Sequence, residues 1–251
     1  MRFECPREDR IPQLRQLWKN AFGDTDEFLD LFFSTGFCPH RCRCVTVEGQ
    51  VAAALYWFDI RWDGLPCAYL YAVATDPSFR GRGLCRALMA DTAAHLRTAG
   101  YEGALLVPQN DGLFGMYGKM GYLPATNICE TICAARAPAA IREIGVSEYA
   151  ALRRPLLPRR SVVQEGDNLT FLSALARFYA GDGFLAAACL ERDHLRILEY
   201  LGDPDAAGGL VAALGRTEAT LRTPGPGKPF SMYLPLSDRC SPPEYFAFPF
   251  D

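Results

Sequence analysis

The spacing of apolar residues in the first third of the chain predicts two helices followed by three strands. Apolar residues three or four positions apart, from Leu14 to Phe22, are typical of a helix, and Gly23 is expected to end it. Residues 24–26 supply capping side chains for a second short helix that continues to residue 32. Three strands separated by turns are expected next, at residues 43–48, 51–61 and 66–74.

The most informative pattern is a buried strand that leads through a glycine-rich basic loop into a helix. Residues 68–74 form an unbroken apolar run, residues 75–79 form a turn, and residues 84–99 have the periodicity of a helix that stops at Gly100. The first N–H groups of a helix lack helical acceptors and the helix dipole is positive there, so this order predicts an anion site. Glycines in the loop allow close approach of the main chain, and arginines supply forked donors for phosphate oxygens. The glycines are Gly81 and Gly83, and the arginines are Arg80, Arg82 and Arg86.

Two nucleotide-binding motifs do not fit this loop. A dinucleotide fingerprint requires glycine where Arg86 stands, and the P-loop string does not occur in the sequence. Residues 80–85 read Arg-Gly-Arg-Gly-Leu-Cys and follow an Asp-Pro pair at 76–77. This segment resembles the acetyl-CoA pyrophosphate loop of the GNAT (GCN5-related N-acetyltransferase) superfamily. Its position between a buried strand and an amphipathic helix makes the resemblance more specific than the loop alone.

A second segment supports the same resemblance. Residues 103–107 form a short apolar strand, residues 109–112 break it, and a helix carrying Tyr117 follows. Helices of the GNAT family that follow the fifth strand carry a tyrosine and end in a glycine–aromatic pair, which Gly121-Tyr122 matches. The string around Tyr117 is most similar to the branch of enhanced-intracellular-survival aminoglycoside acetyltransferases. The resemblance covers about the first 135 residues.

The resemblance implies an α+β fold with α/β/α layers and a central, mostly antiparallel mixed sheet. It implies a catalytic acetyl-CoA-binding domain at residues 1–135, with residues 122–133 supplying its last strands. By the same resemblance, the pantetheine arm would pair along residues 73–75, the N–H of Val73 would face the thioester oxygen, and Tyr117 would donate a proton to the departing thiolate. The acetyl group passes to a primary amine by direct attack. The implied cofactor contacts are Val73, Ala74, Thr75, Arg80, Gly81, Arg82, Gly83, Leu84, Cys85, Arg86, Gly112 and Leu113.

The general base is the second catalytic position that the resemblance raises. The resembled branch uses the carboxylate of its own C-terminus, which makes Asp251 the candidate here, although that branch ends in an aromatic residue instead. Residues 245–250 contain four aromatic side chains, so the tail is expected to dock. Docking for packing alone remains the alternative reading.

The second half of the chain predicts another, smaller domain at residues 136–251, after a linker at 134–138. A helix at 167–179 precedes a hairpin of strands 184–190 and 195–201 that turns at Arg192-Asp193. A helix at 205–214 follows, and then strands near 219–222 and 230–234. This order repeats the late half of the first domain without its basic loop. We therefore interpret it as a degenerate GNAT-like copy that cannot hold the cofactor.

Composition limits the partners. The chain has 251 residues, 49% of them hydrophobic, which is enough for one large or two small cores. Its net charge of −3 argues against a nucleic-acid partner. No apolar run approaches the ~18 residues of a membrane span and no leader is recognised, so we expect no membrane partner and a cytoplasmic location with reduced thiols.

A cysteine-rich segment at residues 38–44 raises the question of a bound metal. Structural zinc sites usually combine paired cysteines with a second, distant pair, which this segment does not. Cys42 and Cys44 alternate on an expected strand and therefore share one face. We interpret them as core residues and expect no metal cofactor.

The sequence predicts an N-acetyltransferase that uses acetyl-CoA as co-substrate. The acceptor is open among aminoglycosides, polyamines, amino acids and peptide lysines, and whether the chain forms a homo-oligomer is open too. The alternative function is a non-catalytic acyl-CoA sensor or protein-interaction module. The presence of Tyr117 favours the enzyme, because a sensor needs the loop but not the acid.

Overall fold

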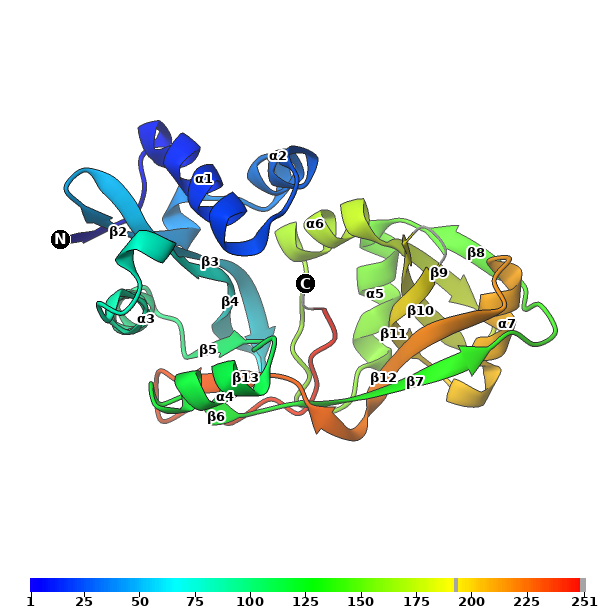
Figure 1. The fold of residues 1–251 in the computed structure, drawn as a ribbon. Coiled ribbons are helices and arrows are strands. Elements are labelled where there is room, and N and C mark those ends of the chain that lie inside the picture. The colour runs from blue at the N-terminus through cyan, green and yellow to red at the C-terminus, as the bar shows by residue number, and fades with distance from the viewer. Residues whose placement is uncertain (192–193, 249–251) are drawn as a thin grey trace. The chain divides into compact units, whose positions relative to one another are not determined.

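The computed structural model describes residues 1–191 and 194–248, and Figure 1 shows its elements. The chain divides into a first unit, Met1–Leu123 with Met232–Ser241, and a second unit, Pro124–Ser231 with Pro242–Asp251. The first unit thus ends earlier than the expected residue 135 and regains a segment from near the end of the chain. The reason is strand pairing, described below.

The first unit contains a seven-stranded mixed sheet in the order β1-β2-β3-β4-β5-β13-β6. Its strands are β1 (Arg2–Glu4), β2 (Cys42–Val47), β3 (Gln50–Trp62), β4 (Leu65–Thr75), β5 (Gly103–Leu106), β6 (Leu123–Pro124) and β13 (Met232–Pro235). Neighbours from β1 to β4 are antiparallel, β4 and β5 are parallel, and β13 returns antiparallel to β5. The mixed, mostly antiparallel sheet expected for the first domain is confirmed.

Helices cover both faces of this sheet, with α3 on one face and α1 and α2 on the other (Figure 1). The helices of the first unit are η1 (Glu8–Arg10), α1 (Ile11–Phe22), α2 (Asp26–Thr35), η2 (Pro39–Arg41), η3 (Pro77–Phe79), α3 (Leu84–Thr98) and α4 (Asp111–Gly118). Gly23 ends α1 with a left-handed φ of 75°, and the Thr25 hydroxyl caps α2 by accepting from the Phe28 N–H at 3.3 Å. The helices expected from apolar spacing are therefore present.

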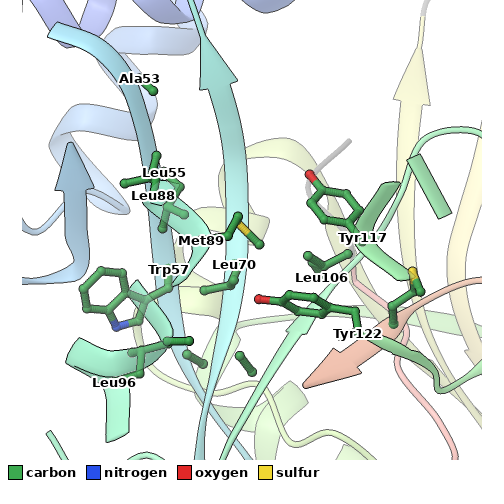
Figure 2. Packing of buried hydrophobic residues seen from close by; sticks show 14 of the residues in the cluster. Ala53, Leu55, Trp57, Leu70, Leu88, Met89, Leu96, Leu106, Tyr117 and Tyr122 are labelled. Carbon is green, nitrogen blue, oxygen red and sulfur yellow. The ribbon is translucent and has the colours of Figure 1, made fainter. Parts of the chain in front are cut away.

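The two faces of the sheet pack different side chains. On the α3 face, aliphatic residues of α3 pack against β3, β4 and β5, and Tyr117 and Tyr122 join this cluster (Figure 2). On the α1 and α2 face the core is aromatic, and the ring centroid of Trp18 lies 4.6 Å from Phe32 and 5.1 Å from Tyr56. Residues of β3 and β4 alternate between these two cores, which fixes the register of the strands.

The second unit has a six-stranded sheet in the order β7-β12-β11-β10-β9-β8. Its strands are β7 (Asn127–Ala134), β8 (Ile141–Ile144), β9 (Arg177–Gly181), β10 (Phe184–Glu191), β11 (His194–Leu201) and β12 (Glu218–Pro229). Its helices are α5 (Val146–Leu156), α6 (Asp167–Leu175), η4 (Pro204–Ala206) and α7 (Ala207–Ala213). The expected turn at Arg192-Asp193 lies outside the described residues.

The second unit repeats the connectivity of the first. β10 runs antiparallel to β11, and α7 then leads to β12, which is parallel to β11. The same order links β3, β4, α3 and β5 in the first unit. Both antiparallel pairs contain a register shift, at Ala54/Tyr56 and at Ala187/Ala188. The second unit is therefore a smaller copy of the same arrangement.

Two expectations about the elements are wrong, and two elements were not expected. β7 does not complete the first sheet, because it pairs along its length with β12, and the first sheet instead receives β13. The helix expected to reach residue 179 ends at Leu175, because Phe178 belongs to β9 and stacks on Tyr149 at 4.1 Å. α5 and β8 were not expected. None of the helices in the described chain combines the length and apolar character that a bilayer crossing requires.

Candidate active site

β4 and β5 are paired at one end and separate at the other. In the described chain their ladder runs only from Cys67 to Tyr69 on β4, whereas β4 continues to Thr75. Just beyond the ladder, Ala72 has a φ of 48°, a conformation that non-glycine residues rarely adopt, and it lies at the register shift with β3. The edge of β4 that faces β5 is therefore open at Val73, and an extended ligand can add there as a strand does.

The open edge leads directly into the basic loop. The Asp76 carboxylate caps η3 by accepting from the Ser78 N–H at 2.9 Å, and α3 begins at Leu84. Gly81 and Gly83 have φ values of 76° and 74°. A Cβ at either glycine would meet no atom within 4 Å, so the left-handed backbone, rather than crowding, is what requires glycine here.

The start of α3 presents unpartnered amides. The Ala87 N–H donates to the Gly83 carbonyl oxygen at 3.0 Å, and this is the first bond of the helix. The N–H groups before it, at residues 83–86, therefore have no helical acceptor. Within the described part of the chain, no side chain caps this helix end. Helix starts with free N–H groups are favourable places for anions, so anion binding here stays the prediction.

Three arginines lie in or beside the loop, and the described hydrogen bonds of their side chains go to neutral carbonyls. Arg80 donates to the Thr75 carbonyl at 3.2 Å, Arg82 to that of Ser78 at 3.2 Å, and Arg86 to that of Lys119 at 3.3 Å. Among the described residues no carboxylate forms an ion pair with any of them, so their charge is left for a bound anion. The Arg82 guanidinium also lies over the Phe79 ring at 5.1 Å, which orients it.

Tyr117 reaches the site from α4. The Asn110 side chain caps α4 by accepting from the Leu113 N–H at 3.1 Å, and Gly112 lies in the same turn. The Tyr117 side chain is 6% exposed and its ring lies 5.9 Å from that of Tyr122 (Figure 2). The structure therefore brings the helix with Tyr117 to the core that also holds the first turn of α3.

Burial controls the protonation of this tyrosine. Desolvation raises the pKa of Tyr117 well above its ordinary value, and the nearby Cys85 thiol adds to the shift. Burial raises the pKa of Cys85 as well. Both groups are therefore neutral near pH 7, and the Tyr117 hydroxyl is a hydrogen-bond donor there.

The second unit has lost the corresponding anion site. The strand β11 leads through η4 straight into α7. Asp203 caps η4 as Asp76 caps η3, and no arginine–glycine segment stands between η4 and α7. The start of α7 is covered, because a Cβ at Gly208 would lie 2.6 Å from the carbonyl oxygen of Ala134. The N–H of Arg136 donates to the Gly208 carbonyl at 3.0 Å. This copy has neither the charge nor the space for a pyrophosphate.

The C-terminal segment is built into the second unit. Phe246 and Phe248 are fully buried, and the Phe248 carbonyl accepts from the Gln164 amide at 3.0 Å. The Tyr245 hydroxyl donates to Glu199 at 3.0 Å. Asp251, the candidate base, lies outside the described residues.

Sequence reasoning missed the buried ionic cluster to which Tyr245 belongs. Glu199 on β11 is fully buried and accepts from Arg153 at 2.7 and 2.9 Å and from the Tyr149 hydroxyl at 2.7 Å. A single carboxylate in the apolar run at residues 195–201 was the available signal. The cysteine-rich segment behaves as expected, since Cys42 and Cys44 share a face and both are fully buried.

Comparisons with known proteins agree with this geometry. The sequence model of the acetyltransferase (GNAT) domain family matches residues 4–125. The N-acetyltransferase Eis of Mycobacterium tuberculosis is 41% identical over 66 residues, which are 26% of this chain and only 16% of that protein. A GCN5-related N-acetyltransferase from Anabaena variabilis superposes with a TM-score of 0.75 at 16% identity, covering 94% of this chain and 73% of its own.

A further structure shares the repeat. A tandem GNAT protein from the clavulanic acid biosynthesis pathway superposes with a TM-score of 0.58 at 14% identity, covering 94% of this chain and 98% of its own. These two structural likenesses define the fold class of the chain. The match to the acetyltransferase (GNAT) domain model lies almost entirely within the first unit, and the chain shares the fold of these two structures.

Proposed function

We propose that this protein is an acetyl-CoA-dependent N-acetyltransferase that transfers the acetyl group to a primary amine by direct attack on the thioester. The observation that carries the proposal is the open edge of β4, which ends in an arginine–glycine loop at the uncapped start of α3. Tyr117, neutral and buried, lies in the core next to the first turn of this helix. The open strand edge, the arginine-bearing helix start and Tyr117 thus occur together in one unit.

The residues present suit coenzyme A. Its pyrophosphate is assigned to the N–H groups of residues 82–86, of which those at 83–86 have no helical acceptor, with Arg80, Arg82 and Arg86 balancing the charge. The pantetheine arm is assigned to the open edge at residues 73–75. Gly112 and Leu113, in the first turn of α4, are proposed as further contacts.

The chemistry needs an oxyanion donor and a proton donor. The amine nitrogen attacks the thioester carbon, the N–C bond forms, and negative charge develops on the carbonyl oxygen. The N–H of Val73 is assigned to stabilise that charge, a contribution of typically ~3 kcal/mol. The C–S bond then breaks, and the thiolate takes the proton of Tyr117.

Glutamate at position 82 is expected to raise the KM for acetyl-CoA at least tenfold with a smaller effect on kcat. The substitution removes a charged donor worth about 2 kcal/mol and places a carboxylate beside the pyrophosphate. Initial rates at varied acetyl-CoA measure this. Arg7→Glu makes the same charge change at an exposed position away from the loop and should leave the KM unchanged. An unchanged KM in Arg82→Glu would refute the pyrophosphate site.

The base that removes the amine proton is proposed to be a carboxylate of Asp251. Deletion of Phe250 and Asp251 is expected to lower kcat and to leave the melting temperature equal to that of the full chain. The melting temperature is expected to hold because Tyr245, Phe246 and Phe248 retain their buried contacts. Full activity after deletion would remove the carboxylate from the mechanism.

The decisive experiment follows thiol release from acetyl-CoA across a panel of amines, with calorimetry of coenzyme A in parallel. The enzyme predicts amine-dependent release. Binding without release for any amine would favour the non-catalytic acyl-CoA sensor. If coenzyme A does not bind, both the enzyme and the acyl-CoA sensor are excluded.

A further inference from the structure

Two cysteines far apart in the sequence lie together in the first unit. Cys67 is on β4, at the closed end of the β4–β5 pair, where it lies opposite Gly103. Cys240 follows β13 in the segment that returns to this unit from near the end of the chain. Their side chains are buried, with exposures of 0% and 6%.

The two thiols form a hydrogen bond with each other. Gly103 makes room for this contact, because a Cβ there would lie 2.5 Å from the Cys240 sulfur. The same Cβ would lie 2.7 Å from the Trp62 ring. The Trp62 indole N–H donates to the carbonyl oxygen of Ser241, the neighbour of Cys240, at 2.9 Å. Strands β4 and β5 and the buried Trp62 indole of β3 therefore hold the pair in place.

The pair is chemically asymmetric. The hydrogen bond to Cys67 holds the pKa of the Cys240 thiol below its usual value, against the opposing effects of burial, Glu102 and Asp63. The same hydrogen bond, together with burial, raises the pKa of Cys67. Thiolate forms first on Cys240, whose neighbours Arg239 and Ser241 are exposed, and the thiolate is the reactive form.

We propose that Cys67 and Cys240 are a site of oxidative modification at which a peroxide converts the contacting thiols into a disulfide. The Cys240 thiolate attacks a peroxide oxygen, the O–O bond breaks, and a sulfenic acid and one water result. The Cys67 sulfur then attacks the Cys240 sulfur, and the S–O bond breaks with release of a second water. The two thiols lose two electrons and two protons, which reduce the peroxide to two waters.

The disulfide would join the two chain segments that make up the first unit. Among the described contacts, the returning segment is held by pairing of β13 with β5 and by bonds such as that from the Leu236 N–H to the Glu102 carbonyl at 2.9 Å. A covalent link across so long a loop restricts the unfolded chain. Oxidation is therefore expected to raise the melting temperature of this unit, by roughly 5–10 °C.

The test treats the reduced full-length protein with hydrogen peroxide, blocks the remaining thiols, and maps its peptides without reduction. The expected result is one linked peptide pair containing Cys67 and Cys240, lost on treatment with dithiothreitol. Cys240→Ser should abolish the link and the rise in melting temperature, whereas Cys42→Ser, at another buried thiol, should abolish neither. Recovery of both thiols in free form, or of Cys240 as a sulfinic acid without the link, would overturn the proposal. Mapping of the unaltered chain decides even where a variant does not fold.

Discussion

Tyr117→Phe is expected to lower kcat by about a hundredfold or more and to leave the KM for acetyl-CoA almost unchanged. Proton donation by a positioned side chain typically contributes 10²–10⁴ in rate, and this substitution removes only the hydroxyl. The ring, which packs against Tyr122 at 5.9 Å, is retained, so the core should be preserved. Pre-steady-state thiol release isolates the chemical step from product release.

The raised pKa of Tyr117 is compatible with this role. The apolar surroundings that raise the pKa of the phenol also desolvate a thiolate formed beside it, and therefore raise the pKa of that thiol as well. The two pKa values move in the same direction, so proton transfer stays balanced. Because the phenol keeps its proton above its ordinary pKa of about 10, kcat should not fall as the pH rises through that value on account of Tyr117.

Tyr122→Phe is the matched control, since it removes the same hydroxyl from the neighbouring ring of the same cluster. Its turnover is expected to equal that of the unaltered protein. Equal turnover in Tyr117→Phe, or equal losses in the two variants, would end the assignment of Tyr117 as the acid.

Local sequence patterns predicted the first unit better than the second. Gly23 and Thr25 end and begin helices through backbone and capping geometry that depend on a few neighbouring residues. Pairing of β13 with β5 depends instead on residues far apart in the sequence, and local hydrophobic periodicity carries no information about such pairing. α5 was hidden by Pro155 near its end and by a buried charge on its inner face.

The candidate site shows the same division. The left-handed conformation of Gly81 and Gly83 is a local requirement that the sequence displays. The positive φ of Ala72, and the separation of β4 from β5 beyond Tyr69, arise from sheet packing and leave no local signal. The loop could therefore be predicted, whereas the open strand edge required the structure.

In the second unit the strand that corresponds to β4 is β11, and it carries the buried Glu199 cluster. Glu199 accepts four hydrogen bonds, two from Arg153 and one each from Tyr149 and Tyr245. The Arg153 guanidinium also lies over the Phe248 ring at 4.8 Å. These donors come from α5 and from the C-terminal segment, so the cluster ties both of them to β11.

Glu199→Ala is expected to lower the free energy of unfolding of the second unit by about 3–5 kcal/mol. The substitution leaves the Arg153 charge buried without its counterion and removes the acceptor of two tyrosine hydroxyls. Urea unfolding followed by circular dichroism measures the loss. Tryptophan fluorescence reports the first unit alone, because Trp18, Trp57 and Trp62 all belong to it.

Two further variants separate charge burial from packing. Arg153→Met with Glu199→Leu removes both charges and should recover much of the stability, because desolvation opposes the attraction within a buried pair. Glu148→Ala breaks the ion pair of Glu148 with Arg142, which is exposed, and should change the unfolding curve very little. If Glu199→Ala unfolds at the same urea concentration as Glu148→Ala, the buried cluster does not hold the second unit together, and the aromatic contacts of the C-terminal segment must do so alone.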